Sequence, residues 1–463
     1  MQAINPTTEQ LIGDYAEHDQ AHVERLLEAA AAAWGSWREK PIGDRAKLMR
    51  GVARVLRHRS AELSALMTRE MGKPIAQSEA EIEKCAVCCD HFAEHAAGYL
   101  AERMIESDAD QSLVRFDPLG AVLAIMPWNF PFWQVFRFAA PALMAGNVGV
   151  LKHAPNVPGC ALAIEDVFRE ARLPAGVFTT LLVDAQAVEG IINHPTIAAV
   201  TLTGSGRAGM AVASEAGQAL KKAVLELGGS DPFIVLPDAD VPATARAAVA
   251  ARCINSGQSC IAAKRFIVVG NAEPFAMEMA KVMAELKVGD PFDRSVDVGP
   301  LARHDLRDNL QSQVEGSIAA GARPLVGGHC LPHKGFFYAP TVLDHVRPGM
   351  AAFDEESFGP VAAVIEARDV DDAIHLANRS HFGLGASIWT KNTQLARELA
   401  ARIDAGCVFI NGPVKSDPRL PFGGIKQSGY GRELSSFGIH EFVNIKTVWI
   451  KESARSAPVE RSE

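Results

Sequence analysis

The sequence predicts an α/β protein in which a doubly wound parallel sheet is joined to a second α/β unit. Two observations lead to this fold class. Between residues 119 and 236, short apolar runs alternate with helical patterns, an alternation typical of parallel sheets. A similar series returns between residues 230 and 427. With 463 residues and 48% apolar side chains, the chain is long enough for two or three cores.

The N-terminal region, residues 20–105, is expected to be helical because its apolar residues recur with a helical period. The three expected helices are 21–37, 44–72 and 78–100. Gly72 and Pro74 supply a stop signal between the second helix and the third.

Three cysteines, Cys85, Cys88 and Cys89, lie at the spacing i, i+3, i+4 on the third of these helices and therefore share one face. A packed helix face is the favoured interpretation, because a free cysteine often behaves as a small buried apolar residue. A metal site is the alternative, but no second CxxC pair follows at zinc-finger spacing. We therefore expect no metal site. Eight cysteines in so long a chain also do not make a disulfide scaffold.

The region from 119 to 236 contains the first sheet. Its expected strands are 121–127, 149–152, 178–183, 198–204, 223–227 and 232–236, and its expected helices include 132–146 and 160–171. Sheets of this kind bind nucleotides at the carboxyl ends of their strands. In the second series, strands are expected within 264–270, 383–390 and 407–412.

The formal net charge of −9 argues against binding to nucleic acid, which favours a basic face. The apolar stretches are far shorter than the ~20 residues of a membrane span, and the start MQAINPTTEQ has no basic flank and no apolar core. We therefore expect a cytoplasmic protein with reduced thiols and with neither a nucleic acid nor a membrane as partner.

Three residues in separate stretches predict covalent catalysis. Cys260 lies in NSGQSCIAAKRF, Glu226 in LELGGSDP and Asn129 in PWNFP. A thiol can attack a carbonyl, a carboxylate can activate water and an amide can stabilise an oxyanion. Together they indicate an enzyme that forms an acyl intermediate on a cysteine.

Gly204, Gly206 and Gly209 spell GxGxxG after an expected strand, and Glu226 follows about 20 residues later, which is the dinucleotide-binding fingerprint. Glu226 can then be read as a ribose ligand, as a catalytic base or as a surface acid. The glycines and Ser205 open a helix whose N-terminus favours anions, so pyrophosphate is expected near this turn in any of these readings.

These stretches, and most of the chain from INPTT to VNIKTVWIK, resemble the aldehyde dehydrogenase superfamily, in particular its bacterial succinate-semialdehyde dehydrogenase branch. The resemblance implies that an aldehyde, most simply succinate semialdehyde, is oxidised with NAD(P)+. Cys260 would form a thiohemiacetal and then a thioester, and Asn129 would hold the oxyanion with the Cys260 backbone N–H. Glu226 would activate the hydrolytic water. For Asn129, a cap of the helix after Pro131 remains the structural alternative.

The resemblance also implies a set of cofactor-binding residues: Trp128, Lys152, Pro155, Gly204, Ser205, Glu356 and Phe358. Lys152 would bind the adenosine ribose, Glu356 the nicotinamide ribose, and Phe358 would pack on the nicotinamide ring. For Phe358, a core aromatic before a Gly-Pro turn remains the alternative. Pro155 stands where many NAD-preferring relatives have an acid that repels a 2′-phosphate, so both NAD and NADP are expected to work, with a slight lean to NADP.

For the substrate, the resemblance points to Arg137 and Ser416. Arg137 lies eight residues after Asn129 among apolar neighbours, where a charge is costly unless paired. It is either a clamp for a substrate carboxylate or part of a buried ion pair. The second arginine of some relatives, six residues before the nucleophile, is Ile254 here, so a further contact would come from elsewhere, for example Arg419. Ala262 replaces a second cysteine of some relatives, so no local disulfide switch is expected.

The resemblance gives the domain plan. Residues 1–99 and 119–229 would form the dinucleotide-binding domain and 230–427 the catalytic domain. Residues 100–118 and 428–455 would form a small β oligomerisation extension with a return segment, leaving a tail at 456–463. A homodimer or a dimer of dimers is expected, with VNIKTVWIK as a strand of the extension, in keeping with its β-branched residues.

Other functions remain open at this point. The chain could act on glutarate semialdehyde or another aldehyde. An enzyme that transfers the acyl group to CoA would not need a water-activating acid, so Glu226 counts against it. A catalytically silent binding protein is disfavoured because Cys260, Asn129 and Glu226 are all present.

Overall fold

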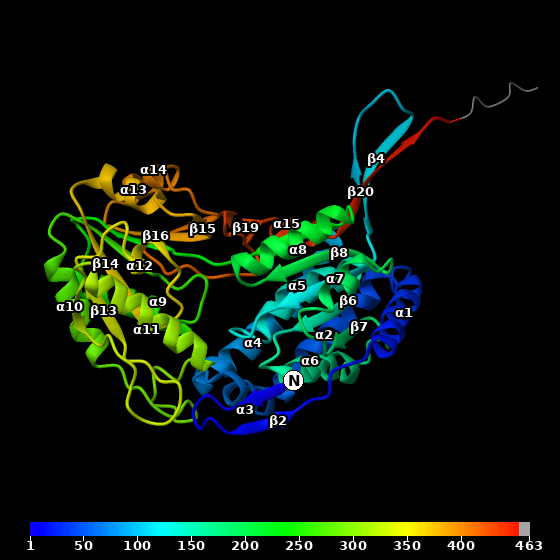
Figure 1. Cartoon of the computed structure of the whole chain (residues 1–463). Helices are drawn as coiled ribbons and strands as arrows, with labels where there is room; N and C mark the ends of the chain where they lie inside the picture. Colours follow the sequence, from blue (N-terminus) through cyan, green and yellow to red (C-terminus); the bar gives the residue numbers. More distant parts are fainter. Residues whose placement is uncertain (453–463) are drawn as a thin grey trace, which may run out of the picture.

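The computed structural model describes residues 1–452 and contains two large sheets, a helical N-terminal region and a projecting β arm (Figure 1). The expected tail at 456–463 and the last residues of the expected return segment, 453–455, lie outside the described residues. The mixed α/β architecture confirms the predicted fold class.

The N-terminal region begins with a hairpin, β1 (Gln2–Ile4) and β2 (Leu11–Asp14), that the sequence did not predict. Four helices follow: α1 (Gln20–Trp37), α2 (Ile42–His58), α3 (Ser60–Met71) and α4 (Ile75–Tyr99). The expected single helix over 44–72 is therefore wrong. It breaks at Arg59, whose backbone leaves helical geometry and whose side chain pairs with Glu62 in the first turn of α3. Gly72 ends α3 in the left-handed conformation, as its position predicted.

The first large sheet has six strands in the order β19-β9-β8-β5-β6-β7. They are β5 (Ala121–Met126), β6 (Val148–His153), β7 (Phe178–Leu181), β8 (Ile197–Thr203), β9 (Lys222–Glu226) and β19 (Gly429–Tyr430). The five longer strands pair in parallel, whereas β19 returns from the C-terminal region and pairs antiparallel with β9. The connecting helices are α5 (Trp133–Ala145), α6 (Pro158–Glu170), α7 (Val188–Asn193) and α8 (Gly206–Gln218).

This sheet is buried on both faces, which explains its continuous apolar strands. β6 is buried along its whole length, and α8 packs against β8 and β9 while α1 packs against β6 and β7. Because the strands are parallel, their carboxyl ends meet at one edge. Candidate site residues follow β5 and β8, Glu226 is the last residue of β9, and Lys152 is the penultimate residue of β6.

The second large sheet has seven strands in the order β12-β13-β14-β11-β10-β16-β17. They are β10 (Pro232–Val235), β11 (Arg265–Val269), β12 (Arg323–Val326), β13 (Thr341–Asp344), β14 (Val361–Ala367), β16 (Gly385–Trp389) and β17 (Cys407–Ile410). Only β12 runs antiparallel to its neighbour. Its helices are α9 (Val241–Cys253), α10 (Glu273–Ala284), α11 (His304–Ala319), α12 (Ala351–Asp354), α13 (Val370–Asn378) and α14 (Thr393–Ala400).

Shorter elements complete the chain. β15 (Phe382–Gly383) pairs with β18 (Ile425–Lys426), and α15 (Ser435–Ile439) precedes the last strand. That strand, β20 (Val443–Ile450), is the predicted VNIKTVWIK strand. It pairs antiparallel with β4 (Gln111–Pro118), which also pairs with β3 (Arg103–Met104). Figure 1 shows this arm projecting from the body of the molecule.

The three clustered cysteines confirm the packed-face interpretation. Cys85, Cys88 and Cys89 are fully buried in the core, and burial raises the pKa of each thiol. Within residues 1–452, no group of three or more His, Cys, Asp and Glu side chains could hold a metal ion, and all eight cysteines are free.

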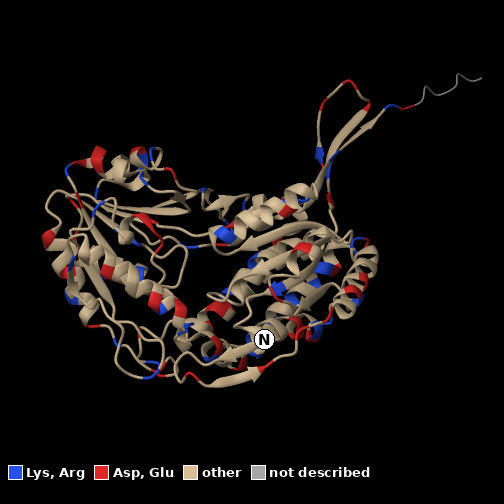
Figure 2. Ribbon diagram, viewed as in Figure 1, with Lys and Arg blue, Asp and Glu red and all other residues tan. Residues whose placement is uncertain are grey.

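No helix in the described part of the chain is long and apolar enough to cross a membrane. Figure 2 shows acidic and basic residues interspersed along the ribbon.

Candidate active site

The loop that carries Cys260 has an unusual backbone. After α9 ends at Cys253, residues Asn255 and Ser256 adopt φ values of 53° and 55°, and Gly257 follows at 79°. A β-carbon on Gly257 would lie 2.2 Å from the Gly359 carbonyl carbon, so only glycine fits there. Asn255 stabilises the turn by donating from Nδ2 to the Asn129 carbonyl oxygen at 2.7 Å. The left-handed turn thereby ties the cysteine loop to the PWNFP segment.

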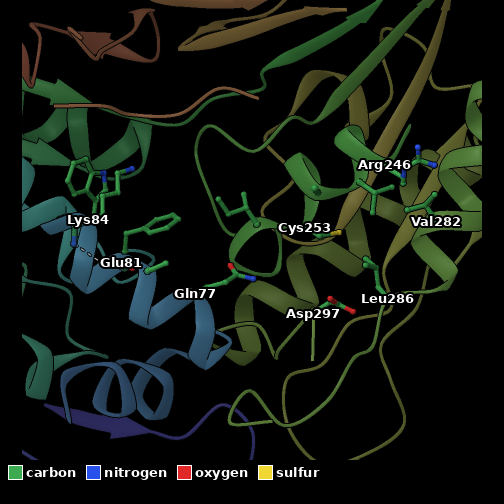
Figure 3. Close-up of a pocket in the computed structure, with 14 residues that line it drawn as sticks. Gln77, Glu81, Lys84, Arg246, Cys253, Val282, Leu286 and Asp297 are labelled. Carbon is green, nitrogen blue, oxygen red and sulfur yellow. Dashed lines mark hydrogen bonds between the residues drawn. The ribbon is translucent and has the colours of Figure 1, made fainter. Parts of the chain in front are cut away.

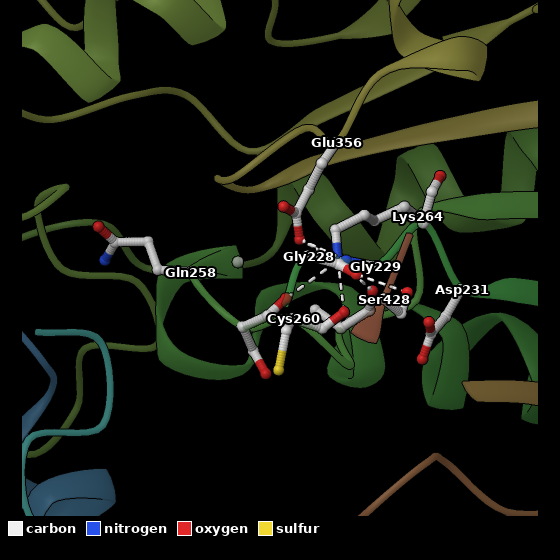
Figure 4. Close-up of polar contacts among 12 residues, drawn as sticks. Gly228, Gly229, Asp231, Gln258, Cys260, Lys264, Glu356 and Ser428 are labelled. Atoms are coloured by element: carbon white, nitrogen blue, oxygen red, sulfur yellow. Dashed lines mark hydrogen bonds and ion pairs between the residues drawn. The ribbon is translucent and has the colours of Figure 1, made fainter. Parts of the chain in front are cut away.

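Lys264 holds the other side of this loop (Figure 4). Its Nζ donates to the carbonyl oxygens of Ser259, Cys260 and Ala262 at 3.0, 2.8 and 3.2 Å. It also lies 3.6 Å from Oε1 of Glu356. The side chain is 1% exposed, and Figure 4 shows the Cys260 thiol pointing away from it. One buried cation thus fixes the backbone of the nucleophile loop and links it to Glu356.

A cavity of about 440 Å³ brings together seven of the predicted site residues. They are Trp128, Asn129, Gly204, Ser205, Cys260, Glu356 and Phe358. The first four come from the carboxyl edge of the six-stranded sheet, and the other three from the half that contains the seven-stranded sheet. The cavity therefore lies between the two halves. Glu226, Lys152, Pro155, Arg137 and Ser416 do not line it.

The Asn129 side chain bonds to the loop that carries Cys260 and does not cap α5. Its Nδ2 donates to the carbonyl oxygen of Gln258 at 3.1 Å, two residues before the nucleophile. The alternative that Asn129 caps α5 is wrong, because Glu81 occupies that position: its Oε1 accepts from the backbone N–H groups of Phe132 and Trp133, both at 2.9 Å. Burial raises the pKa of Cys260 to about 12, an effect that the positive charges of Arg137 and Lys264 oppose.

Glu226 is the last residue of β9 and is 2% exposed. Burial raises the pKa of its carboxyl group to about 8. A β-carbon on Gly423 would lie 2.8 Å from Oε1 of Glu226, so this glycine leaves room for the carboxyl group. Neither of its oxygens has a hydrogen-bond partner within residues 1–452. The carboxyl group is therefore buried beside the Gly423 loop, whereas Gly204 and Ser205 of the GxGxxG turn face the cavity.

The cofactor side of the cavity fits a nicotinamide dinucleotide. The rings of Trp128 and Phe358 meet edge to face, with centroids 5.7 Å apart, and both line the cavity. Phe358 is only half-buried, so it is not an aromatic residue fully enclosed in a core. Glu356 lies beside them, and its Oε1 accepts from the Gly229 backbone N–H at 2.9 Å. The aromatic surface suits the nicotinamide ring, and the neighbouring carboxylate suits the hydroxyl groups of its ribose.

The GxGxxG turn lies at the N-terminus of α8, a position that favours anions. The Ser205 side chain caps α8 by accepting from the Ala208 N–H at 3.3 Å, and Gly204 lines the cavity directly before this helix N-terminus. A β-carbon on Gly209 would lie 2.6 Å from Leu227, so this glycine allows α8 to pack closely on the sheet. Lys152, 8% exposed, is the penultimate residue of β6, and Pro155 follows it at the surface.

Arg137 adopts one of the two arrangements that the sequence allowed, a buried ion pair. Its guanidinium is 1% exposed and pairs with the carboxylate of Glu433. Its Nη2 donates to Oγ1 of Thr203 at 3.3 Å, and the group lies 4.7 Å above the centroid of the Phe422 ring. The positive charge remains close enough to Cys260 to oppose the rise in the thiol pKa.

A second cavity of about 600 Å³ lies on the other side of the PWNFPFW segment (Figure 3). Phe130 and Trp133 line it, whereas Asn129 and Gln134 line the first cavity. Figure 3 shows Lys84 and Glu81 of α4 on one side, and Cys253 and Val282 on the other. Ile254, 43% exposed, is also in its wall.

Sequence reasoning missed Lys84. Its Nζ donates to Oγ of Ser416 at 2.8 Å, and Nε1 of Trp133 donates to the same oxygen at 3.0 Å. The only signal in the sequence was a lysine next to Cys85, in a helix with a buried face. Arg419, suggested as a further substrate contact, is instead exposed at the surface and paired with Asp417.

Comparison with known proteins agrees with this geometry. The model of the aldehyde dehydrogenase family matches residues 1–448. The chain is 52% identical over 448 residues to a probable NADP+ succinate-semialdehyde dehydrogenase of Synechocystis, covering 96% of this chain and 99% of that protein. It is 51% identical over 448 residues to the NAD(P)+ succinate semialdehyde dehydrogenase Sad of Escherichia coli, covering 96% and 97%.

Among solved structures, succinic semialdehyde dehydrogenase from Streptococcus pyogenes in complex with NADP+ superposes with a TM-score of 0.95 at 35% identity. The match covers 97% of this chain and 100% of that one. The chain therefore belongs to the aldehyde dehydrogenase family and oxidises aldehydes with NAD(P)+ as the hydride acceptor.

Proposed function

We propose that the enzyme oxidises succinate semialdehyde to succinate with NAD(P)+, and that Cys260, Asn129 and Glu226 carry the chemistry. The observation that supports this most directly is the cavity in which Cys260 and Asn129 meet the aromatic pair and Glu356. The substrate is inferred from the two relatives at about half identity, both of which are named for this semialdehyde.

The first step is attack of the Cys260 thiolate on the aldehyde carbon. Burial disfavours the thiolate, so the nearby cations Arg137 and Lys264 are needed to offset this effect. The Asn129 amide and the Cys260 backbone N–H would stabilise the oxyanion of the thiohemiacetal. Loss of one such donor typically costs about 3 kcal/mol in the barrier.

When bound, NAD(P)+ accepts the hydride that leaves the substrate carbon. Trp128, Glu356 and Phe358 would orient the nicotinamide end, Gly204 and Ser205 the pyrophosphate, and Lys152 the adenosine ribose. Pro155 offers no carboxylate to repel a 2′-phosphate, which supports the use of both NADP and NAD. The protein thereby holds the reacting carbon against the acceptor.

The last step is hydrolysis of the thioester on Cys260 by a water that Glu226 deprotonates. Its raised pKa suits a general base near neutral pH. Because its carboxyl group is buried beside Gly423, we infer that the side chain turns towards Cys260 in this step. Ser416 is proposed to contact the carboxylate end of the substrate, and Arg137, which is paired with Glu433, to act on it through its positive charge.

We further propose that the enzyme is a cytoplasmic homo-oligomer and that the arm of β4 and β20 forms the contact. Four large apolar side chains on the arm are more than half exposed: Met104, Ile105, Ile445 and Trp449. Contact with a second copy of the chain would remove them from water.

A steady-state panel tests the proposed function. Aldehydes of two to six carbons and their ω-carboxy counterparts are assayed with NAD and with NADP. We expect kcat/KM to be highest for succinate semialdehyde. A maximum at glutarate semialdehyde or at an uncharged aldehyde would replace the proposed substrate, and absence of activity with every aldehyde would overturn the proposal.

A further inference from the structure

Lys84 is a desolvated cation without an acidic partner. Its ammonium bonds to Ser416 and lies 4.1 Å above the centroid of the Trp133 ring. Within residues 1–452 no carboxylate pairs with it, because its neighbour Glu81 pairs with Lys73 and holds the start of α5. Burial, together with the charge of Arg137, lowers the pKa of Lys84 to about 8. An anionic ligand would supply the missing countercharge.

The hydrogen bonds around Ser416 leave two donors free. A hydroxyl group has two lone pairs and one proton. Both lone pairs of Ser416 accept hydrogen bonds, from Lys84 at 2.8 Å and from Trp133 at 3.0 Å. Its own proton is therefore left for an outside acceptor. The Lys84 ammonium likewise has N–H groups beyond the one that Ser416 accepts. Two donors and a positive charge at one point suit the two oxygens of a carboxylate.

The position of Lys84 in the molecule suits the far end of a short substrate. Lys84 and Trp133 line the second cavity, whose wall includes Phe130 and Ile254. Phe130 directly follows Asn129, and Ile254 begins the loop that leads to Cys260. The guanidinium of Arg137, by contrast, already has Glu433 as its counterion. Of these two cations, Lys84 and Arg137, only Lys84 has no carboxylate partner within residues 1–452.

We propose that Lys84 and Ser416 form the binding site for the ω-carboxylate of the substrate, so that Lys84 determines specificity for a semialdehyde acid. The inference rests on the proposed function and deepens it. Some relatives have an arginine six residues before the nucleophile, and this chain has the uncharged Ile254 there. Lys84 supplies the positive charge that is missing at that position. Arg137 then does not bind the carboxylate directly. It contributes its ion pair with Glu433 and its positive charge, which acts on Lys84.

The test compares substrates within each variant. Lys84→Met removes the charge but keeps a long apolar side chain against Trp133. The quantity measured is the ratio of kcat/KM for succinate semialdehyde to kcat/KM for butanal. We expect Lys84→Met to lower this ratio about 10- to 100-fold, the usual effect of a lost hydrogen bond to a charged group, and Ser416→Ala to lower it roughly 3- to 10-fold. Lys415→Met, an exposed lysine of the same loop, is the matched control and should leave the ratio unchanged.

The outcomes separate the inference from the proposed function. A wild-type enzyme without preference for the semialdehyde acid would overturn both. A wild-type enzyme with that preference, in which Lys84→Met leaves the ratio unchanged, would overturn the inference alone. Equal losses with both substrates would also overturn it, since they indicate a structural role. If Lys84→Met does not fold, the ratio in Ser416→Ala decides, and an unchanged ratio there overturns the inference.

Discussion

At the scale of single residues, burial disfavours the charged forms of both Cys260 and Glu226. Burial raises the pKa of the thiol to about 12 and that of the carboxyl group to about 8. The reaction therefore depends on how the protein ionises each group at the step that uses it. For Glu226 the direction is clear: its capacity as a base is lost as the pH falls below about 8.

We expect the hydrolytic step to show this dependence. In the wild-type enzyme, the rate of thioester hydrolysis should rise about tenfold per pH unit up to about pH 8 and then level off. In Glu226→Gln this rise should disappear, and about one equivalent of NADPH per site should form in a burst before turnover stalls. Stopped-flow absorbance of NADPH between pH 6 and pH 9 measures both effects.

Cys260→Ala serves as the control, because it should give no burst at any pH. If Glu226→Gln instead weakens cofactor binding and no acyl-enzyme accumulates, Glu226 is the ribose ligand of the GxGxxG reading and not the base.

Individual candidate site residues could be singled out from the sequence where a short motif carries them. Asn129, Glu226 and Cys260 each lie in a run of sequence that is informative by itself. Lys84 was not predictable, because its meaning comes from contact with Ser416, 332 positions away. The Arg137 ion pair with Glu433 depends in the same way on a distant segment, so the sequence left two arrangements open.

At the scale of elements, the loop around Cys260 depends on Lys264. The ammonium satisfies three backbone carbonyl oxygens and pairs with Glu356. Lys264→Met should leave these groups without a partner and destabilise the protein by about 3 kcal/mol. Chemical denaturation measures this change. We also expect faster alkylation of Cys260 by iodoacetamide, because the loop is held less firmly.

Lys281→Met is the matched control, since this lysine of α10 has a side chain that is 66% exposed. Equal free energies of unfolding for Lys264→Met and Lys281→Met would show that the Lys264 contacts are not needed to hold the loop.

Most elements were predictable because their apolar periods are strong. All six strands expected between 121 and 236 are present, although the last of them, β10, belongs to the seven-stranded sheet. The break between α2 and α3 was missed because arginine is no helix breaker, so the residue type of Arg59 gave no sign that its backbone leaves helical geometry. The left-handed turn at Asn255 and Ser256 was equally invisible, because neither residue alone demands that backbone.

At the scale of the whole molecule, the exposed apolar side chains of the β4 and β20 arm predict that the chain assembles with a second copy of itself. Ile445→Asp places a charge where we propose contact with a second copy of the chain, so we expect a smaller species in analytical ultracentrifugation. Leu220→Asp changes an apolar residue that is 94% exposed on the body and should leave the assembly unchanged. A wild-type chain that sediments as a monomer would contradict the proposed role of the arm.

The short strand β19 has a consequence for how the enzyme is made. It pairs with β9, the strand that ends in Glu226, yet it lies more than 200 positions further along the chain. Gly423, which leaves room for the Glu226 carboxyl group, and Glu433, the counterion of Arg137, come from the same late segment. A ribosome has therefore synthesised nearly all of the chain before the surroundings of the base exist. Nascent or prematurely terminated chains that stop before this segment, even those that already carry Cys260, lack the groups that surround Glu226.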